Sequence, residues 1–389
     1  MWIERDIGEL TKRVTKQYPI LLLTGVRQAG KTELLRHYFP DFHYISLDLP
    51  SEAEQADKEG HDFLNRHPEP LIIDEAQYAP GLFRSLKKRI DDDRSRCSRY
   101  ILTGSQKFPL MKEVSESLAG RIGMVELEPL SAKEIVAAYN TLTVEDILPR
   151  GGYPALYRDR SVDFSVYFRS YVSSYLERDL RSLLKVGNLR DFERFLRACA
   201  LRSGQLLNRS ELARDVGISA TTANEWISVL AASNVVYLLE PWFHNASKSV
   251  IKSPKLYLND SGLTCFLCGI QTKDDLLRSP LLGGIWESFV FAEMRKLYAS
   301  RTGGWDFFFF RDRQKEVDFV MSRGGRFDLY EAKWSTHPGP GDCAGMNEVA
   351  RELGEENIAS RQIICRTPNE YLLDAHSKAI NLAELAFRI

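Results

Sequence analysis

Short apolar runs that end in small or polar residues organise the first third of the chain. They cover residues 21–23, 71–73 and 100–102. A continuous apolar run of this kind is typical of a strand buried on both faces of a parallel sheet. A helix-forming segment, "TELLRHYF", follows the first run, so the pattern predicts an α/β domain. Open parallel sheets bind ligands at the carboxyl ends of their strands, and we expect the site there.

The first run leads into a glycine-bounded loop, "GVRQAGKT" at residues 25–32, which fits G-x-x-x-x-G-K-[ST] at every fixed position. In such a loop, backbone N–H groups turn towards the β-phosphate of a nucleotide and the lysine reaches the outer phosphates. The threonine hydroxyl is a Mg²⁺ ligand, and the following helix places its positive end under the phosphates. The loop therefore predicts an ATP site with Mg²⁺. The residues expected to bind this nucleotide and its metal are Gly25, Gln28, Ala29, Gly30, Lys31, Thr32 and Asp74.

Polar residues also follow the other two runs. Asp74 and Glu75 end the second run, where the aspartate can hold the magnesium through water and the glutamate can polarise the attacking water. The third run ends in polar groups able to sense the γ-phosphate, and we assign a catalytic role to Ser105 among them. These groups are Thr103, Gly104, Ser105 and Gln106.

Arg121 is a further catalytic candidate, at an expected helix end directly before another apolar strand. In oligomeric ATPases an arginine at this point reaches the γ-phosphate of the neighbouring subunit. The alternative is an arginine that caps the carbonyls of the preceding helix. The sequence leaves both roles open.

The segments "GVRQAGKT", "IIDEAQ", "LTGS" and "LAGR", in this order, resemble the bacterial and archaeal AAA-type ATPases whose C-terminal half is a domain of unknown function. The later "GGYPALY", at residues 151–157, also fits, because its G-x-P element resembles the lid motif of the signal-transduction branch of such ATPases. The resemblance covers nearly the whole chain. It implies ATP hydrolysis and assembly into a homo-oligomeric, hexamer-like ring, and it names no substrate.

The middle of the chain reads as helical. Apolar residues recur at helical spacing through residues 130–200, as a helical lid over the nucleotide would require. Beyond it, Asn208 and Glu211 form a capping box, and Gly217 supplies a turn before a second helix. This is a helix-turn-helix pattern, which strands near residues 235–239 and 255–258 continue as in a winged helix.

The helix-turn-helix pattern does not establish DNA binding by itself. The residues expected on the outer face of its second helix are Thr221, Thr222, Asn224, Glu225 and Ser228. None is basic, and a glutamate faces phosphates badly. The wing-like stretch does carry Lys248, Lys252 and Lys255. Nucleic-acid contact and a purely structural or protein-binding role both stay open.

A second chemical pattern lies near the C-terminus, where Gly324-Gly325 joins two alternating runs into a hairpin. Asp318 precedes the turn, Glu331 and Lys333 follow it, and Glu287 lies on an earlier amphipathic helix. The set resembles the metal-dependent nuclease core PD-(D/E)-x-K, which has a restriction-endonuclease-like α/β fold. That resemblance implies that Asp318 and Glu331 bind a second divalent ion, while Lys333 positions or activates the attacking water. Glu287 would complete the coordination shell of the ion. The alternative is an inherited scaffold whose acidic residues form surface ion pairs.

The chain is too long, at 389 residues, for one ordinary core, and the patterns predict a multidomain α/β protein. We expect a P-loop AAA-type domain at 1–130 and a helical lid at 131–200. A winged helix-turn-helix domain at 201–262 and the nuclease-like domain at 263–389 follow.

Composition limits the partners without naming one. The net charge of -1 gives no overall attraction to nucleic acid or membrane, so any basic surface is local. The six cysteines have no framework spacing, and Cys265-x-x-Cys268 lacks a second pair for a zinc site. The N-terminus has no apolar signal core, and no run approaches the roughly 20 apolar residues of a spanning helix. We therefore expect a cytoplasmic protein.

Three functions fit these patterns. The prediction is an oligomeric Mg²⁺-dependent ATPase that binds or remodels DNA through its C-terminal domains. The first alternative is a nucleotide-gated signalling switch whose C-terminal part binds protein and whose nuclease-like domain is silent. The second alternative is an ATP-gated, metal-dependent DNA nuclease.

Overall fold

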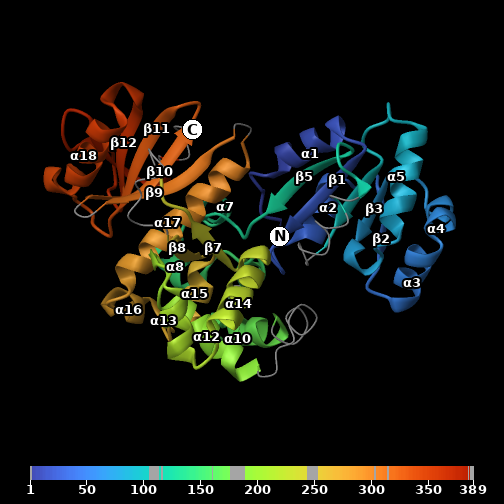
Figure 1. Ribbon diagram of the computed structural model, residues 1–389, viewed down its shortest axis with the longest axis horizontal. Helices are drawn as coiled ribbons and strands as arrows, with labels where there is room; N and C mark the ends of the chain where they lie inside the picture. The colour runs from blue at the N-terminus through green and yellow to red at the C-terminus, as the bar shows by residue number, and fades with distance from the viewer. Residues whose placement is uncertain are drawn as a thin grey trace. The chain divides into compact units, whose positions relative to one another are not determined.

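The computed structural model describes residues 2–104, 114, 117–159, 161–175, 189–242, 253–301, 304–312, 315–383 and 385. Four of the residues singled out above lie outside this part of the chain: Ser105, Gln106, Lys248 and Lys252. The chain divides into two compact units (Figure 1). The first comprises Met1–Leu130, Tyr153–Arg158 and Ala232–Asn234, and the second comprises Ser131–Gly152, Asp159–Ala231 and Val235–Ile389.

A five-stranded parallel sheet forms the centre of the first unit, in the order β2-β3-β4-β1-β5. The three predicted strands and their parallel arrangement are confirmed. The strands are β1 (Ile20–Gly25), β2 (His43–Ser46), β3 (Leu71–Asp74), β4 (Tyr100–Thr103) and β5 (Ile122–Leu127). The helices are α1 (Gly8–Gln17), α2 (Lys31–Tyr38), α3 (Pro50–Lys58), α4 (Gly60–Arg66), η1 (Ala76–Tyr78), α5 (Leu82–Asp92) and α9 (Ala155–Arg158).

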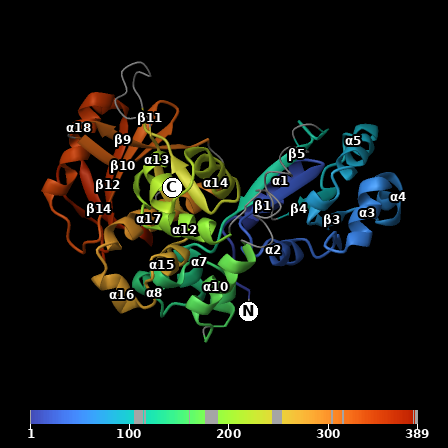
Figure 2. The same cartoon turned by 60° about the horizontal axis from the view of Figure 1, so that its bottom comes forward.

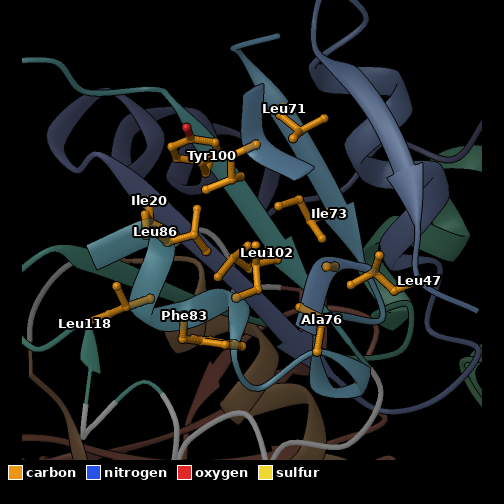
Figure 3. Packing of buried hydrophobic residues seen from close by; sticks show 14 of the residues in the cluster. Ile20, Leu47, Leu71, Ile73, Ala76, Phe83, Leu86, Tyr100, Leu102 and Leu118 are labelled. Carbon is orange, nitrogen blue, oxygen red and sulfur yellow. The ribbon is translucent and has the colours of Figure 1, made fainter. Parts of the chain in front are cut away.

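The core of the first unit fixes the carboxyl ends of these strands. Ile73 of β3 and Leu102 of β4 pack with Phe83 and Leu86 of α5 in one cluster of buried side chains (Figure 3). All six residues of β1 are buried, as a strand covered on both faces requires. Full burial of each such side chain contributes roughly 1.5–3 kcal/mol, so the strand ends are held firmly in register.

The second unit begins with helices and a small sheet. Its helices are α7 (Ala132–Ala138), α8 (Val144–Arg150), α10 (Phe164–Tyr175), α12 (Leu189–Ala200), α13 (Arg209–Val216) and α14 (Ala220–Ala232). The strands β6 (Gln205–Leu206), β7 (Val236–Leu239) and β8 (Lys255–Leu258) form an antiparallel sheet in the order β6-β8-β7. One half of the predicted capping box is present, since the Asn208 side chain accepts from the Glu211 amide at 3.1 Å, and Gly217 supplies the predicted turn with a φ of +84°. Trp226 of α14 packs against Phe192 and Phe195 of α12.

A six-stranded mixed sheet completes the second unit, in the order β13-β14-β12-β11-β10-β9. Helix α18 packs against this sheet (Figure 2), and Phe291 of α17 stacks on Phe319 of β10. Gly324 and Gly325, with φ of +57° and +82°, turn the chain between β10 and β11, so the predicted hairpin is confirmed. The helices are α15 (Ser261–Leu267), α16 (Lys273–Arg278), α17 (Leu282–Ala299), η3 (Pro340–Cys343), α18 (Ala344–Leu353) and η4 (Glu355–Asn357). The strands are β9 (Asp306–Asp312), β10 (Lys315–Arg323), β11 (Arg326–Ala332), β12 (Ile358–Cys365), β13 (Tyr371–Leu372) and β14 (Ser377–Asn381).

The stretch beyond His337 finishes this sheet, because β12, β13 and β14 all come from it. Among the described residues, no helix has both the length and the apolar character needed to cross a bilayer. The division into four domains, and the role of the helices after residue 130 as a lid, stay predictions.

Candidate functional site

The loop between β1 and α2 adopts a backbone shape that requires glycine. Gly25 has a φ of +142°, and a Cβ built there would lie 2.1 Å from the Leu127 carbonyl oxygen. Gly30 has a φ of +94°, and Gln28 also has a positive φ, of 64°. Alternation of left- and right-handed residues turns successive N–H groups into one concavity, which suits an anion. Ala29 is buried within this turn.

Lys31 begins α2 and folds its side chain back over the loop. Its ammonium donates to the carbonyl oxygens of Gly25 at 2.9 Å and Val26 at 3.1 Å. These two carbonyl acceptors are neutral, and only 8% of the lysine is exposed. A phosphate oxygen would be a stronger partner for this ammonium, since hydrogen bonds between two charged groups exceed those to a neutral carbonyl.

Asp74, at the end of β3, joins three elements of the first unit. Its Oδ2 accepts from the Thr32 hydroxyl at 2.7 Å and from the Tyr44 hydroxyl at 2.7 Å, while its Oδ1 accepts from the Glu75 amide at 3.0 Å. Burial and the Asp74 carboxylate raise the pKa of Tyr44, so the phenol keeps its proton and donates it. A hydroxyl and a buried carboxylate in contact are oxygen ligands that suit Mg²⁺. The sequence missed Tyr44, because nothing in the β2 segment marks it as a neighbour of β3.

Glu75 and Thr103 lie at the ends of the adjacent strands β3 and β4. Glu75 has a φ of 55°, and its carboxylate accepts from the Gln77 side-chain amide. Thr103 is fully buried, and its hydroxyl has no hydrogen-bond partner within the part of the chain that the structure describes. Buried hydroxyls are nearly always paired, so an unpaired one at this edge is suited to a ligand oxygen.

Arg121 lies directly before β5 and is held within its own chain. Its guanidinium donates to both carboxylate oxygens of Asp91 in α5, at 2.8 and 3.0 Å, and to the Ala119 carbonyl at 3.0 Å. These bonds lower the pKa of Asp91. The carbonyl bond matches the capping role, whereas a role across an interface would require the guanidinium to leave Asp91.

Two residues distant in sequence support the loop. Arg5 donates to the Ala29 carbonyl at 3.0 Å and to the Glu128 carbonyl at 2.7 Å, which ties the loop to the segment after β5. Pro154, from the G-x-P element, lies 3.7 Å from the position of a Cβ built on Gly30. No pattern in the sequence marked Arg5, which precedes the first predicted strand.

The predicted DNA-facing surface carries little positive charge. On α14, Thr221, Asn224, Glu225 and Ser228 are exposed, as predicted. Lys255, however, is only 2% exposed. The interpretation of Lys255 as part of a basic wing is therefore wrong, because β8 directs the ammonium into the protein interior.

The predicted nuclease-like residues come together in the second unit. Asp318 and Glu331 lie on the paired strands β10 and β11, and the Asp318 Oδ2 accepts from the Ala332 amide at 3.0 Å. The Lys333 ammonium lies 3.3 Å from a carboxylate oxygen of Glu331. Glu287 of α17 reaches the same place and accepts from the Tyr257 hydroxyl at 2.6 Å.

Burial makes two carboxyl groups of this cluster weaker acids than usual. It raises the pKa of Glu331 to about 9 and that of Glu287 to about 7, and the Asp318 carboxylate adds to both shifts. Two residues outside the predicted nuclease-like set complete the cluster: the Lys255 ammonium and the Glu316 carboxylate, 3.0 Å apart. Across the described ranges, no group of three or more His, Cys, Asp or Glu side chains is arranged to hold a metal ion. The predicted second metal site is thus not supported.

Three sequence models of protein families match successive parts of the chain. One described as an AAA domain matches residues 17–136. Two described as domains of unknown function, DUF8612 and DUF4143, match residues 141–274 and 282–385. The AAA domain therefore coincides with the parallel sheet and its phosphate loop.

Among solved structures, the Walker-type ATPase PABY2304 of Pyrococcus abyssi resembles this chain with a TM-score of 0.45 and 19% sequence identity. The alignment covers 68% of this chain and 96% of that protein. The likeness is partial, and the family follows from sequence relatives instead.

Two mycobacterial proteins are similar over most of their length. Rv2008c of Mycobacterium tuberculosis and Mb2031c of Mycobacterium bovis are each 33% identical over 351 residues, which covers 87% of this chain and 76% of each relative. Similarity of this extent spans both units rather than the AAA domain alone. The chain belongs to the family of AAA-domain proteins that includes these two mycobacterial relatives.

Proposed function

We propose that the protein binds Mg²⁺-ATP at the loop of residues 25–32 and hydrolyses it. The observation that carries this proposal is the contact of the Thr32 hydroxyl with the Asp74 carboxylate, at 2.7 Å, beside a loop whose amides form an anion-binding concavity. The match of an AAA domain to this region supports the same function. Bound Mg²⁺ would neutralise charge on the outer phosphates.

Each residue of the nucleotide site has a separate role in this proposal. Lys31 would leave the carbonyl oxygens of Gly25 and Val26, both neutral, to bind phosphate. Thr32 and Asp74 hold the metal, and Glu75 orients and polarises the attacking water. The unpaired hydroxyl of Thr103 would donate to the γ-phosphate, and Ser105 follows it two residues later. Each role needs only groups at the carboxyl edge of one sheet.

Arg121 keeps two roles in this proposal. A transition-state role would place it on the nucleotide of a neighbouring copy in a homo-oligomer, while its bonds to Asp91 and Ala119 favour a structural role. Mixing experiments separate these roles. If Arg121→Ala loses hydrolysis and regains it when mixed with a Lys31→Ala subunit that carries the arginine, the action is across an interface; failure to regain it favours capping.

We further propose that the second unit binds a partner, either nucleic acid or protein, on which the ATPase acts. The order α12, β6, α13, α14, β7, β8, with the sheet order β6-β8-β7, is typical of a winged helix and favours DNA. The outer face of α14, which carries Glu225 and no basic residue, favours a protein partner instead. DNA-stimulated hydrolysis would support a DNA-directed ATPase, and a slow rate that DNA leaves unchanged would support a nucleotide-gated switch.

One assay tests the central proposal. The purified protein should hydrolyse ATP only with Mg²⁺, and Lys31→Ala should lose nucleotide binding almost completely because the phosphates lose their main charge partner. Lys12→Ala is the matched control, since Lys12 is an exposed lysine of α1 paired with Glu9. Rates are compared with no DNA and with single-stranded, duplex and branched DNA. A folded protein without affinity for adenine nucleotides would refute the function.

A further inference from the structure

The carboxylates that the nuclease-like pattern assigns to a divalent ion surround a lysine. The Lys255 ammonium lies 3.0 Å from a carboxylate oxygen of Glu287, 3.0 Å from one of Glu316 and 3.5 Å from one of Asp318. These carboxylates come from α17 and β10, and the lysine comes from β8. One cation in contact with three carboxylates occupies the position at which those oxygens converge.

Burial makes this lysine a fixed part of the interior. Its side chain is 3% exposed, and its ammonium lies 5.7 Å from the centre of the Phe309 ring. Burial alone would lower the pKa of Lys255, but the three carboxylates outweigh it and raise the pKa, so the ammonium keeps its charge. A buried charge of this kind persists only where partners compensate it. The cluster therefore differs from surface ion pairs, which water screens.

The carboxylate oxygens have further partners within the chain. The Glu287 Oε1 that contacts Lys255 also accepts from the Tyr257 hydroxyl at 2.6 Å, and Asp318 accepts from the Ala332 amide at 3.0 Å. Lys333 supplies a second ammonium, 3.3 Å from Glu331. A divalent ion needs several free, ionised oxygens at about 2.0–2.6 Å, and these groups are committed to hydrogen-bond donors instead.

We propose that the Lys255 ammonium is the resident cation of this carboxylate cluster, taking the place that a divalent ion would occupy in a metal-dependent nuclease. The second unit accordingly binds neither Mg²⁺ nor Mn²⁺ at these carboxylates and does not cleave phosphodiesters through them. The ammonium instead joins β8 to α17 and β10, which makes the cluster a structural element of the second unit. This inference does not depend on the proposed ATPase function.

The test uses the full chain without nucleotide, so that the phosphate loop contributes no metal site. Thermal unfolding is followed with and without Mn²⁺, and binding is measured by isothermal titration calorimetry. For the parental protein we expect no one-to-one binding and no rise in the unfolding midpoint. In Lys255→Ala, which frees the carboxylates, we expect Mn²⁺ to bind and to raise the midpoint by roughly 5–10 °C at about 100 times its Kd.

Two variants identify the site. Lys255→Ala combined with Asp318→Asn should lose the response to Mn²⁺. Lys296→Ala is the matched control, because Lys296 also has a largely buried side chain, 2.8 Å from a carboxylate oxygen of Glu293, and its removal should create no Mn²⁺ response.

Measurements on the parental protein test the proposal even if Lys255→Ala fails to fold. One-to-one Mn²⁺ binding to the parental protein that Asp318→Asn removes would overturn the proposal. So would cleavage of plasmid DNA with Mn²⁺ and ATP that is lost in Asp318→Ala. A folded Lys255→Ala protein that binds no Mn²⁺ would also overturn it, because the carboxylates would then form no cation site.

Discussion

Two buried lysines, one in each unit, show that the same side chain can belong to a ligand-binding site or to a structural ion-pair cluster. Lys31 is 8% exposed and Lys255 is 2% exposed, so both ammonium groups are largely shielded from water. The ammonium of Lys31 donates to two carbonyl oxygens. That of Lys255 is paired with Glu287, Glu316 and Asp318.

The difference lies in the charge of the partners. A neutral carbonyl yields to an incoming phosphate, because the ammonium gains an ionic partner. The carboxylates do not yield, since Asp318 and Glu287, which are largely buried, would lose their cation when the lysine moved. The Gly25 and Val26 carbonyls can therefore be exchanged for a ligand oxygen at Lys31, whereas Lys255 already has its counterions. A lysine near acidic residues in a sequence does not reveal which of these cases applies.

The largest effect is expected for Glu75→Gln at the nucleotide site. The amide keeps the shape of the side chain but cannot accept a proton from water, so ATP should still bind while turnover falls about 10²–10⁴-fold. Nucleotide binding by calorimetry and phosphate release measure the two effects. Glu54→Gln, at an exposed glutamate paired with Lys58, serves as the control. Hydrolysis at the parental rate would mean that another residue polarises the water.

The two lysines can be compared directly through stability. Lys255→Ala leaves buried carboxylates without their cation and should lower the free energy of unfolding by roughly 3–5 kcal/mol. Lys31→Ala removes hydrogen bonds to two carbonyls and should cost about 1 kcal/mol. Urea unfolding without nucleotide gives both values. An equal or reversed order would contradict the contrast between counterions and carbonyls.

The pKa shifts predict how pH acts on the C-terminal cluster. Because the pKa of Glu331 is raised from an ordinary 4.5 to about 9, the folded state holds a proton that the unfolded state releases. The contribution of this residue to stability is thus fully present below about pH 4.5 and is lost as the pH rises towards 9. In Glu331→Gln the fall of the unfolding midpoint between pH 5 and 9 should be smaller. A parallel fall in both proteins would show that Glu331 does not carry the effect.

The smallest effect is expected for Tyr44→Phe. Asp74 loses the hydrogen bond from Tyr44 and keeps those from Thr32 and the Glu75 amide. The lost bond contributes about 1 kcal/mol to holding the Asp74 carboxylate in its orientation. We expect kcat/KM for ATP to fall roughly fivefold, with a fall of the unfolding midpoint of no more than roughly 2–4 °C. Tyr371→Phe, whose hydroxyl donates to the Pro338 carbonyl in the second unit, should leave the rate unchanged.

Local rules predicted much of the fold. The apolar runs gave the central strands β1, β3 and β4, and the loop pattern gave the start of α2. Asn208 and Gly217 marked the ends of α13, and Gly324-Gly325 marked the hairpin. Each of these features depends on residues within a few positions of one another, so a pattern in the chain records it.

The sequence by itself determined the phosphate loop, the strands that carry it, and the helix-turn-helix and hairpin of the second unit, because backbone conformation and side-chain periodicity are local properties. Only the tertiary structure decided which side chains meet. Tyr44 and Asp74 are 30 residues apart, and Lys255 and Asp318 are 63 apart. Such pairs leave no periodic signal, since the packing of β2 beside β3, and of β8 against α17 and β10, brings them together. The identity of the cation at the C-terminal carboxylates is therefore a consequence of packing.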